Sequence, residues 1–161
     1  MKRPSGSTVS AVSACAILVF GALLFSAPAR AQKINEIARS GPYTFNLKVL
    51  SPESFQGPNA EMVRDSGAEP VLVSGPIQPN HHLVVFIKKN GKPVENAQVN
   101  ITYTRSEWGH WKRLPVVRMH VAGKGPETTH FGNNVLLKPG KYRVEVRVDH
   151  KVKSHFMVDV D

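Results

Sequence analysis

The chain has 161 residues, with 21 lysines and arginines against 12 acidic residues, which gives a formal net charge of +9 at neutral pH. Its one cysteine, Cys15, lies inside an N-terminal apolar run. A single cysteine excludes an intramolecular disulfide. The region after this run has no thiol, which excludes thiol catalysis and a blue-copper site there, since that site needs a thiolate ligand.

The N-terminal residues have the pattern of a secretory signal peptide. Two basic residues precede the apolar run 11–25, and the small-residue signature Ala29-Arg30-Ala31 follows it. This order is typical of a cleaved signal, and the run is shorter than the roughly 20 residues of a transmembrane helix. We therefore expect residues 1–31 to be removed, and residues 32–161 to form one soluble periplasmic domain with no membrane span.

The charge of the exported part bears on its partners. The signal carries three of the 21 basic residues and none of the 12 acidic ones, which leaves the rest of the chain at +6. In a cytoplasmic protein this balance would suggest nucleic acid, but export argues against that partner. A solvated basic surface, an acidic protein partner or an anionic membrane surface fits better.

The first half of the exported part predicts three strands. Residues 32–40 read as a loose leader, with a short helical turn as the alternative. Residues 43–50 alternate apolar and polar side chains, as in a half-buried strand. Residues 51–67 contain two prolines and two glycines, which indicates a long irregular loop. A short strand at 71–73 and a central strand at 82–89, apolar on both faces, follow.

The second half predicts more strands of the same kind. Asn90-Gly91 is a strong hairpin signal, and residues 123–132 read as loop. Further strands are predicted at residues 99–104, 114–121, 142–148 and 154–160. About seven or eight short strands without an amphipathic helix predict an all-β, immunoglobulin-like antiparallel β-sandwich, with a closed barrel as the alternative.

Imidazole and thioether are the soft metal ligands that the exported part supplies. The candidates are His81, His82, His110, His120, His130, His150 and His155, with Met62, Met119 and Met157. Such a set favours copper, or iron, over calcium and magnesium. Motifs for a serine nucleophile, a zinc protease or a phosphate-binding loop do not occur, so we do not expect an enzyme.

One stretch resembles a known family. Met119 precedes the run His-Phe-Gly-Asn-Asn-Val at 130–135, and this run leads into Pro-Gly-Lys-Tyr at 139–142. The order is similar to that of the periplasmic iron-transport-associated family of copper- and iron-binding immunoglobulin-like proteins. In that family a methionine stands ahead of a His-Tyr-Gly-x-Asn-Val motif and a Gly-x-Tyr strand. The similarity covers residues 119–148.

The resemblance implies a ligand set and a role. Met119 would be the thioether ligand and His130 an imidazole ligand, with His82 as the early histidine. His150, or in its place His155, would be the late one. The implied cargo is copper or ferrous iron, and the implied partner is an inner-membrane iron permease or a metal carrier. A homodimer is compatible with this role.

The chain departs from the family pattern at three points. Val84 stands where the family has a glutamate two residues after its early histidine, and Phe131 replaces the tyrosine of the motif. The interval between Met119 and His130 is also longer than in the family.

A second reading of the sequence is a non-metal immunoglobulin-like module that binds an envelope protein. The basic surface and the segment 108–111, with its two tryptophans, motivate this reading. That segment could be a ligand platform or a loop tucked onto the sandwich, and we favour the tucked loop because large aromatic residues most often contribute burial.

Overall fold

The computed structural model describes residues 34–74, 76, 78–105 and 109–161. The expected signal segment 1–31 and Trp108 lie outside the described residues. Within the described ranges the chain forms eleven strands and one short 3-10 helix: β1 (Ile34–Ser40), β2 (Tyr43–Leu50), β3 (Met62–Gly67), β4 (His81–Lys89), β5 (Lys92–Pro93), β6 (Val99–Thr104), β7 (Lys112–Leu114), β8 (Val117–Val121), η1 (Pro126–Thr128), β9 (His130–Val135), β10 (Gly140–Val148) and β11 (Val152–Val160).

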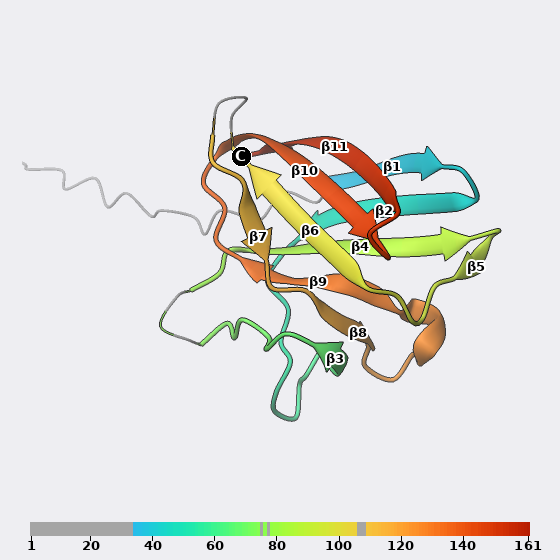
Figure 1. Cartoon of the computed structure of the whole chain (residues 1–161). Helices are drawn as coiled ribbons and strands as arrows, with labels where there is room; N and C mark the ends of the chain where they lie inside the picture. The colour runs from blue at the N-terminus through green and yellow to red at the C-terminus, as the bar shows by residue number, and fades with distance from the viewer. Residues whose placement is uncertain (1–33, 75, 77, 106–108) are drawn as a thin grey trace, which may run out of the picture.

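These strands form two antiparallel sheets that pack face to face (Figure 1). The larger, seven-stranded sheet has the order β1-β2-β4-β9-β8-β3, with β5 paired to β4. The smaller sheet has the order β11-β10-β6-β7. The predicted all-β sandwich is confirmed, and two separate sheets stand in place of the alternative closed barrel.

The core lies between the sheets and follows the period-two pattern of the sequence. Strand residues spaced by two point to the same face, so alternate apolar positions meet in one layer. From the larger sheet come Phe45, Leu47, Leu83, Val85 and Ile87, and from the smaller sheet Ile101, Val144, Val146, Phe156 and Val158, all of them buried.

Three segments differ from their predictions near the larger sheet. Residues 34–40 form β1, which pairs with residues 43–49 of β2, because backbone hydrogen bonds do not require an apolar pattern. Part of the predicted loop 51–67 forms β3 against β8. Residues 71–73, by contrast, are not a strand.

The predicted loop 123–132 also ends earlier than expected, because residues 130–135 form β9. All six residues of this strand are buried, including one histidine and two asparagines. The buried polar side chains interrupt the apolar alternation by which a strand is recognised in a sequence. The amide groups of the two asparagines are hydrogen-bonded mostly to loop backbone, as described below, so the burial of these two side chains costs little.

Pro115 explains why the predicted strand 114–121 is two strands. Proline has no N–H to donate to a sheet, so the pairing of β7 with β6 stops at Leu114. After Val116 the chain enters the larger sheet as β8, beside β9. This crossing between the two sheets places Met119 opposite His130.

Candidate metal centre

A second buried cluster lies on the outer face of the larger sheet, away from the main core. It comprises Met62, Val84, Val117 and Met119, and the partly buried Leu50, Phe55, Phe86 and Val121 pack against it. On β4 the residues at 82, 84 and 86 alternate with the core residues at 83, 85 and 87, so they face this cluster. The sheet is therefore buried on both faces here.

The register of the three central strands brings the candidate ligands together. Met119 pairs directly with His130, while His82 pairs with Asn134. Between the two histidines on this face lies Gly132, the partner of Val84. The imidazole centroids are 6.1 Å apart, with an angle of 86° between the ring planes.

Gly132 is required for this arrangement. A Cβ atom at this position would lie 2.1 Å from the carbonyl oxygen of Leu83 and 2.7 Å from the Cα of Val84. Real Cβ atoms do not approach backbone so closely, so any other residue would push β9 away from β4. The glycine thus permits the two strands, and the two imidazoles, to lie as they do.

Asn134 fixes the orientation and the tautomer of His82. Its amide nitrogen donates to the carbonyl oxygens of Glu53 and Val71, at 2.9 and 2.8 Å, which identifies the other atom as the oxygen. That oxygen accepts from the Glu53 N–H at 3.0 Å and from His82 Nδ1 at 2.8 Å. Since a carbonyl oxygen only accepts, Nδ1 carries the hydrogen and Nε2 carries the lone pair.

His130 is held in the same tautomer by backbone. Its Nδ1 lies 2.8 Å from the carbonyl oxygen of Thr128, so Nδ1 donates here as well. The Thr128 hydroxyl donates to the Gly125 carbonyl and accepts from the Val121 N–H, which fixes the turn before β9. Phe86 stacks on the His130 ring with 4.7 Å between centroids.

Both Nε2 atoms are buried and have no hydrogen-bond partner among the described residues. The two histidines are fully shielded from solvent, with 0% exposure. Burial lowers the pKa of His82 to about 4, an effect that the Asn134 hydrogen bond partly offsets and that the nearby His130 reinforces. Burial also lowers the pKa of His130. Both imidazoles are therefore neutral at pH 7, the state that binds metals.

Besides the two imidazoles, the third candidate ligand on this face is a thioether. In the part of the chain that the structure describes, no three histidine, cysteine, aspartate or glutamate side chains are grouped so as to hold an ion. Met119, also 0% exposed, lies directly across from His130 on the same face. Three of the four predicted ligands, His82, Met119 and His130, thus lie on the outer face of the larger sheet, with His130 next to each of the other two.

The fourth predicted ligand, His150, is not part of this group. It lies in the exposed turn between β10 and β11, beside Glu145 and Arg147 on the outer face of the smaller sheet. The alternative late histidine, His155, lies on that same face, with Nε2 3.7 Å from the Glu145 carboxylate. The sandwich core separates both from the outer face of the larger sheet.

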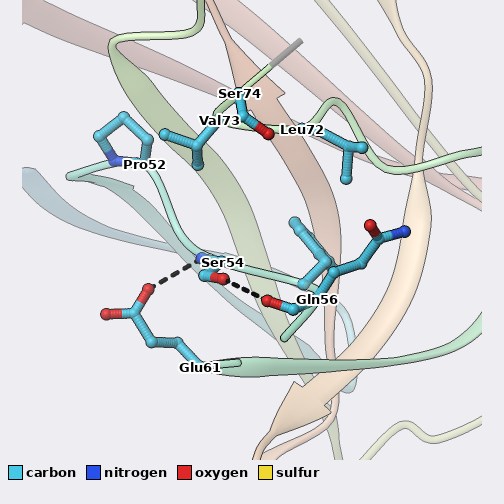
Figure 2. A pocket seen from close by; sticks show the side chains of 8 residues that line it. Pro52, Ser54, Gln56, Glu61, Leu72, Val73 and Ser74 are labelled. Carbon is cyan, nitrogen blue, oxygen red and sulfur yellow. Dashed lines mark hydrogen bonds between the residues drawn. The ribbon is translucent and has the colours of Figure 1, made fainter. Parts of the chain in front are cut away.

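A cavity of about 410 Å³ opens beside the cluster (Figure 2). Phe55 lines this cavity and also packs edge-on against His82, with ring centroids 6.0 Å apart. Its loop is fixed at Ser54, whose N–H donates to the Glu61 carboxylate and whose carbonyl accepts from the Met62 N–H. The Phe55 ring therefore lies between the cavity and the buried imidazole.

Glu53, at this edge of the site, is a further group whose pKa is shifted. Burial raises its pKa to about 7, and a hydrogen bond with Glu61 together with the negative charge of that residue acts in the same direction. Glu53 therefore keeps a proton up to near neutral pH.

Two features of the site were missed from the sequence. The role of Asn134 was not foreseen, although a pair of asparagines inside an apolar, glycine-containing run is unusual enough to signal buried hydrogen bonding. Met62 was placed in an irregular loop, and no local pattern predicted that it would face Met119.

Replacing Asn134 should destabilise the protein. In Asn134→Ala the polar groups of Glu53, Val71 and His82 lose their partners inside the fold, and each unsatisfied group costs about 1–3 kcal/mol. We expect the free energy of unfolding to fall by about 3 kcal/mol or more in urea denaturation. Asn59→Ala, on the exposed part of the same loop, should change it by less than about 0.5 kcal/mol. Equal effects of the two variants would contradict the role of Asn134.

The metal-free protein should lose stability as the pH falls from about 6.5 to about 4. Unfolded His82 binds a proton below its ordinary pKa of 6.5, whereas native His82 binds one only near 4, so acid favours the unfolded state in this window. Between about pH 7.5 and about pH 5 the contribution of His82 is about 2 kcal/mol.

The raised pKa of Glu53 acts in the opposite sense over part of this window, because the native state then holds the extra proton. The decisive quantity is therefore the difference between the wild type and His82→Gln in urea denaturation with chelator present. The wild type should lose more stability than His82→Gln, and as much as the control His155→Gln. An identical loss in wild type and His82→Gln would contradict the buried, neutral state of His82.

Comparisons with protein-family models, with curated proteins and with solved structures returned no match. A role for this centre therefore has to follow from its own geometry. The described residues contain no helix long and apolar enough to cross a membrane.

Proposed function

We propose that this protein is an exported metal-binding protein that holds copper or ferrous iron at His82, His130 and Met119 and supports transport of the metal across the envelope. One observation carries the proposal. Two adjacent, fully buried imidazoles have their Nδ1 hydrogens committed to carbonyl oxygens, while both Nε2 lone pairs have no partner among the described residues.

A purely structural role for the two histidines explains this arrangement poorly. A buried acceptor without a partner costs about 1–3 kcal/mol, and an apolar residue of similar size would avoid that cost. Metal-binding histidines, by contrast, typically donate the other ring hydrogen to a carbonyl or carboxylate oxygen, which orients the ring. Asn134 and the Thr128 carbonyl do this for His82 and His130.

Several features favour transport over permanent storage. The ligand set has two imidazoles and Met119 without a carboxylate, so coordination is incomplete and the ion can pass to another carrier. Phe55 both lines the cavity and contacts the His82 ring, so its movement would open a path. The signal-like N-terminus and the resemblance over residues 119–148 support export and a metal-transport partner such as an inner-membrane iron permease.

Metal titration tests the proposal. Calorimetry of the purified protein with Cu(I), Cu(II) and Fe(II), under anaerobic conditions for the reduced ions, should give one equivalent bound more tightly than about 1 μM. His82→Gln and His130→Gln should each weaken binding about 100-fold or more, since each removes one of the few ligands.

His155→Gln is the matched control, because this histidine is exposed on the smaller sheet. It should leave the affinity unchanged. If the wild type binds none of the three ions more tightly than about 1 μM, or if the His82 and His130 variants bind as well as His155→Gln, the proposal fails. The non-metal interaction module would then be the better account.

A further inference from the structure

The outer face of the smaller sheet is open to solvent and rich in cations. On β10 and β11 the residues that alternate with the buried core are exposed or half-buried, and they point to this outer face. Through their pairing with β10 and with each other, β6 and β7 continue the same face with Asn100, Thr102 and Arg113. The basic residues of this face are Arg113, Lys141, Arg143, Arg147 and Lys153, and its acidic residues are Glu145 and Asp159. We call this net positive surface the basic face.

Glu145, the acidic residue at the centre of the basic face, is paired with cations of the face itself. Arg147 donates to its Oε1 at 2.9 Å, and the Nε2 of His155 lies 3.7 Å from its Oε2. The Glu145 side chain is 20% exposed, whereas that of Arg147 is 45% exposed. A molecule that approaches the face therefore meets the guanidinium before it meets the carboxylate.

Two cations of the basic face lie directly opposite each other. In the register of β10 against β11, Arg147 pairs with Lys153, and both residues are exposed. Like charges in such a cross-strand pair are destabilising, so sheet stability alone would favour an acid at one of the two positions. An anion shared by the two side chains would remove the repulsion. A hollow of about 320 Å³, lined in part by Arg113, Arg147 and His150, offers room for an anionic group beside this pair.

Large apolar side chains stand among these cations. Contrary to the prediction of a tucked loop, Trp111 is 48% exposed, and the guanidinium carbon of Arg143 lies 5.6 Å from the centroid of its ring. Met157, the cross-strand partner of Arg143, is 58% exposed. Tryptophan and arginine suit the boundary between lipid headgroups and acyl chains, because each joins an apolar body to a polar group.

We propose that the basic face binds the surface of a membrane that contains anionic phospholipids. The charge of the face is complementary to that of such a surface. Successive outward positions on β10 are about 7 Å apart, so the cations are spread over a sheet and do not converge on one enclosed ligand. The exposed Trp111 and Met157 favour a lipid surface over a free phosphate, which needs no apolar contact.

The proposed contact leaves the candidate metal centre unobstructed. His82 and His130 lie on the outer face of the other sheet, across the sandwich core from the basic face. The segments around β3 on that side expose Glu61 and Glu69, which an anionic membrane would repel. Charge therefore orients the protein with its basic face toward the lipid. The proposal does not depend on metal binding, which calorimetry tests separately.

Co-sedimentation with vesicles of phosphatidylcholine and phosphatidylglycerol tests the proposal. At about 0.1 M salt, the variant Lys141→Gln/Arg147→Gln/Lys153→Gln should bind on the order of 100-fold more weakly than the wild type, about fivefold for each cation lost. The three side chains are exposed, so urea denaturation should show little change in stability. The wild type should bind vesicles of pure phosphatidylcholine far more weakly, and its affinity for the mixed vesicles should fall about tenfold or more when the salt is raised to about 0.5 M.

The matched control is Lys88→Gln/Lys89→Gln/Lys92→Gln, which removes the same charge from exposed lysines at the β4–β5 hairpin of the larger sheet. It should weaken binding less than about fivefold, because stacked sheets lie about 10 Å apart, about one Debye length at this salt. The compared proteins share the same N-terminus, so the apolar run 11–25 contributes equally to each.

Met157→Gln tests the apolar part of the contact and should weaken vesicle binding about threefold or more, because an exposed methionine then no longer enters the lipid boundary. Equal losses in the two triple variants would show that binding follows net charge alone and would overturn the proposal. So would equal binding to charged and uncharged vesicles, an unchanged affinity in Met157→Gln, or tighter binding to double-stranded DNA than to vesicles at the same salt.

Discussion

The hydrogen bonds of the Asn134 side chain are the constraint on which the site depends. This one amide ties the loop residue Glu53 and the segment at Val71 to the middle of the larger sheet, and it orients His82 at the same time. The side-chain oxygen of the neighbouring Asn133 accepts from the Val71 N–H, and its amide nitrogen donates to the carbonyls of Glu69 and Pro115. The two asparagines thus tie the segment at Glu69 and Val71 to β9, and Asn134 also holds the loop at Glu53 as a cover over the outer face of the sheet.

That cover turns an ordinary sheet face into a buried compartment. An antiparallel sheet normally leaves its second face to solvent, where imidazole nitrogens are hydrated. Here the loop around Phe55 shields the face, so His82 and His130 are both 0% exposed. Loss of hydration makes the neutral imidazole dominant, and this is the state that binds metals.

The fold could be predicted from the sequence to the extent that its strands follow a simple pattern. Residues 43–50, 82–89, 99–104, 142–148 and 154–160 alternate or are continuously apolar, and each forms the expected strand. The pattern failed at β1, whose exposed residues are held by backbone pairing, and at β9, whose buried residues are polar. It also could not show that Pro115 transfers the chain from one sheet to the other.

The site was partly predictable for a different reason. Met119 and His130 were chosen through the resemblance around the Phe-Gly-Asn-Asn-Val run, and the register of β8 against β9 places them as direct partners. The prediction for His82 had less support from the sequence. The pairing of β4 with β9 places this residue beside His130. The sequence could not place His150 and Met62, because the sheet and the face on which a residue lies are fixed by the packing of distant strands. Spacing along the chain does not reveal that packing.

The most direct test of the account is the state of the imidazole nitrogens, observed by long-range proton–nitrogen NMR correlation on the nitrogen-15-labelled protein. His82 and His130 should be neutral at pH 7 with the hydrogen on Nδ1, and one equivalent of Cu(I) should shift the Nε2 resonances of these two residues alone. Protonated rings, hydrogens on Nε2, or shifts at the exposed His150 and His155 in their place would contradict it.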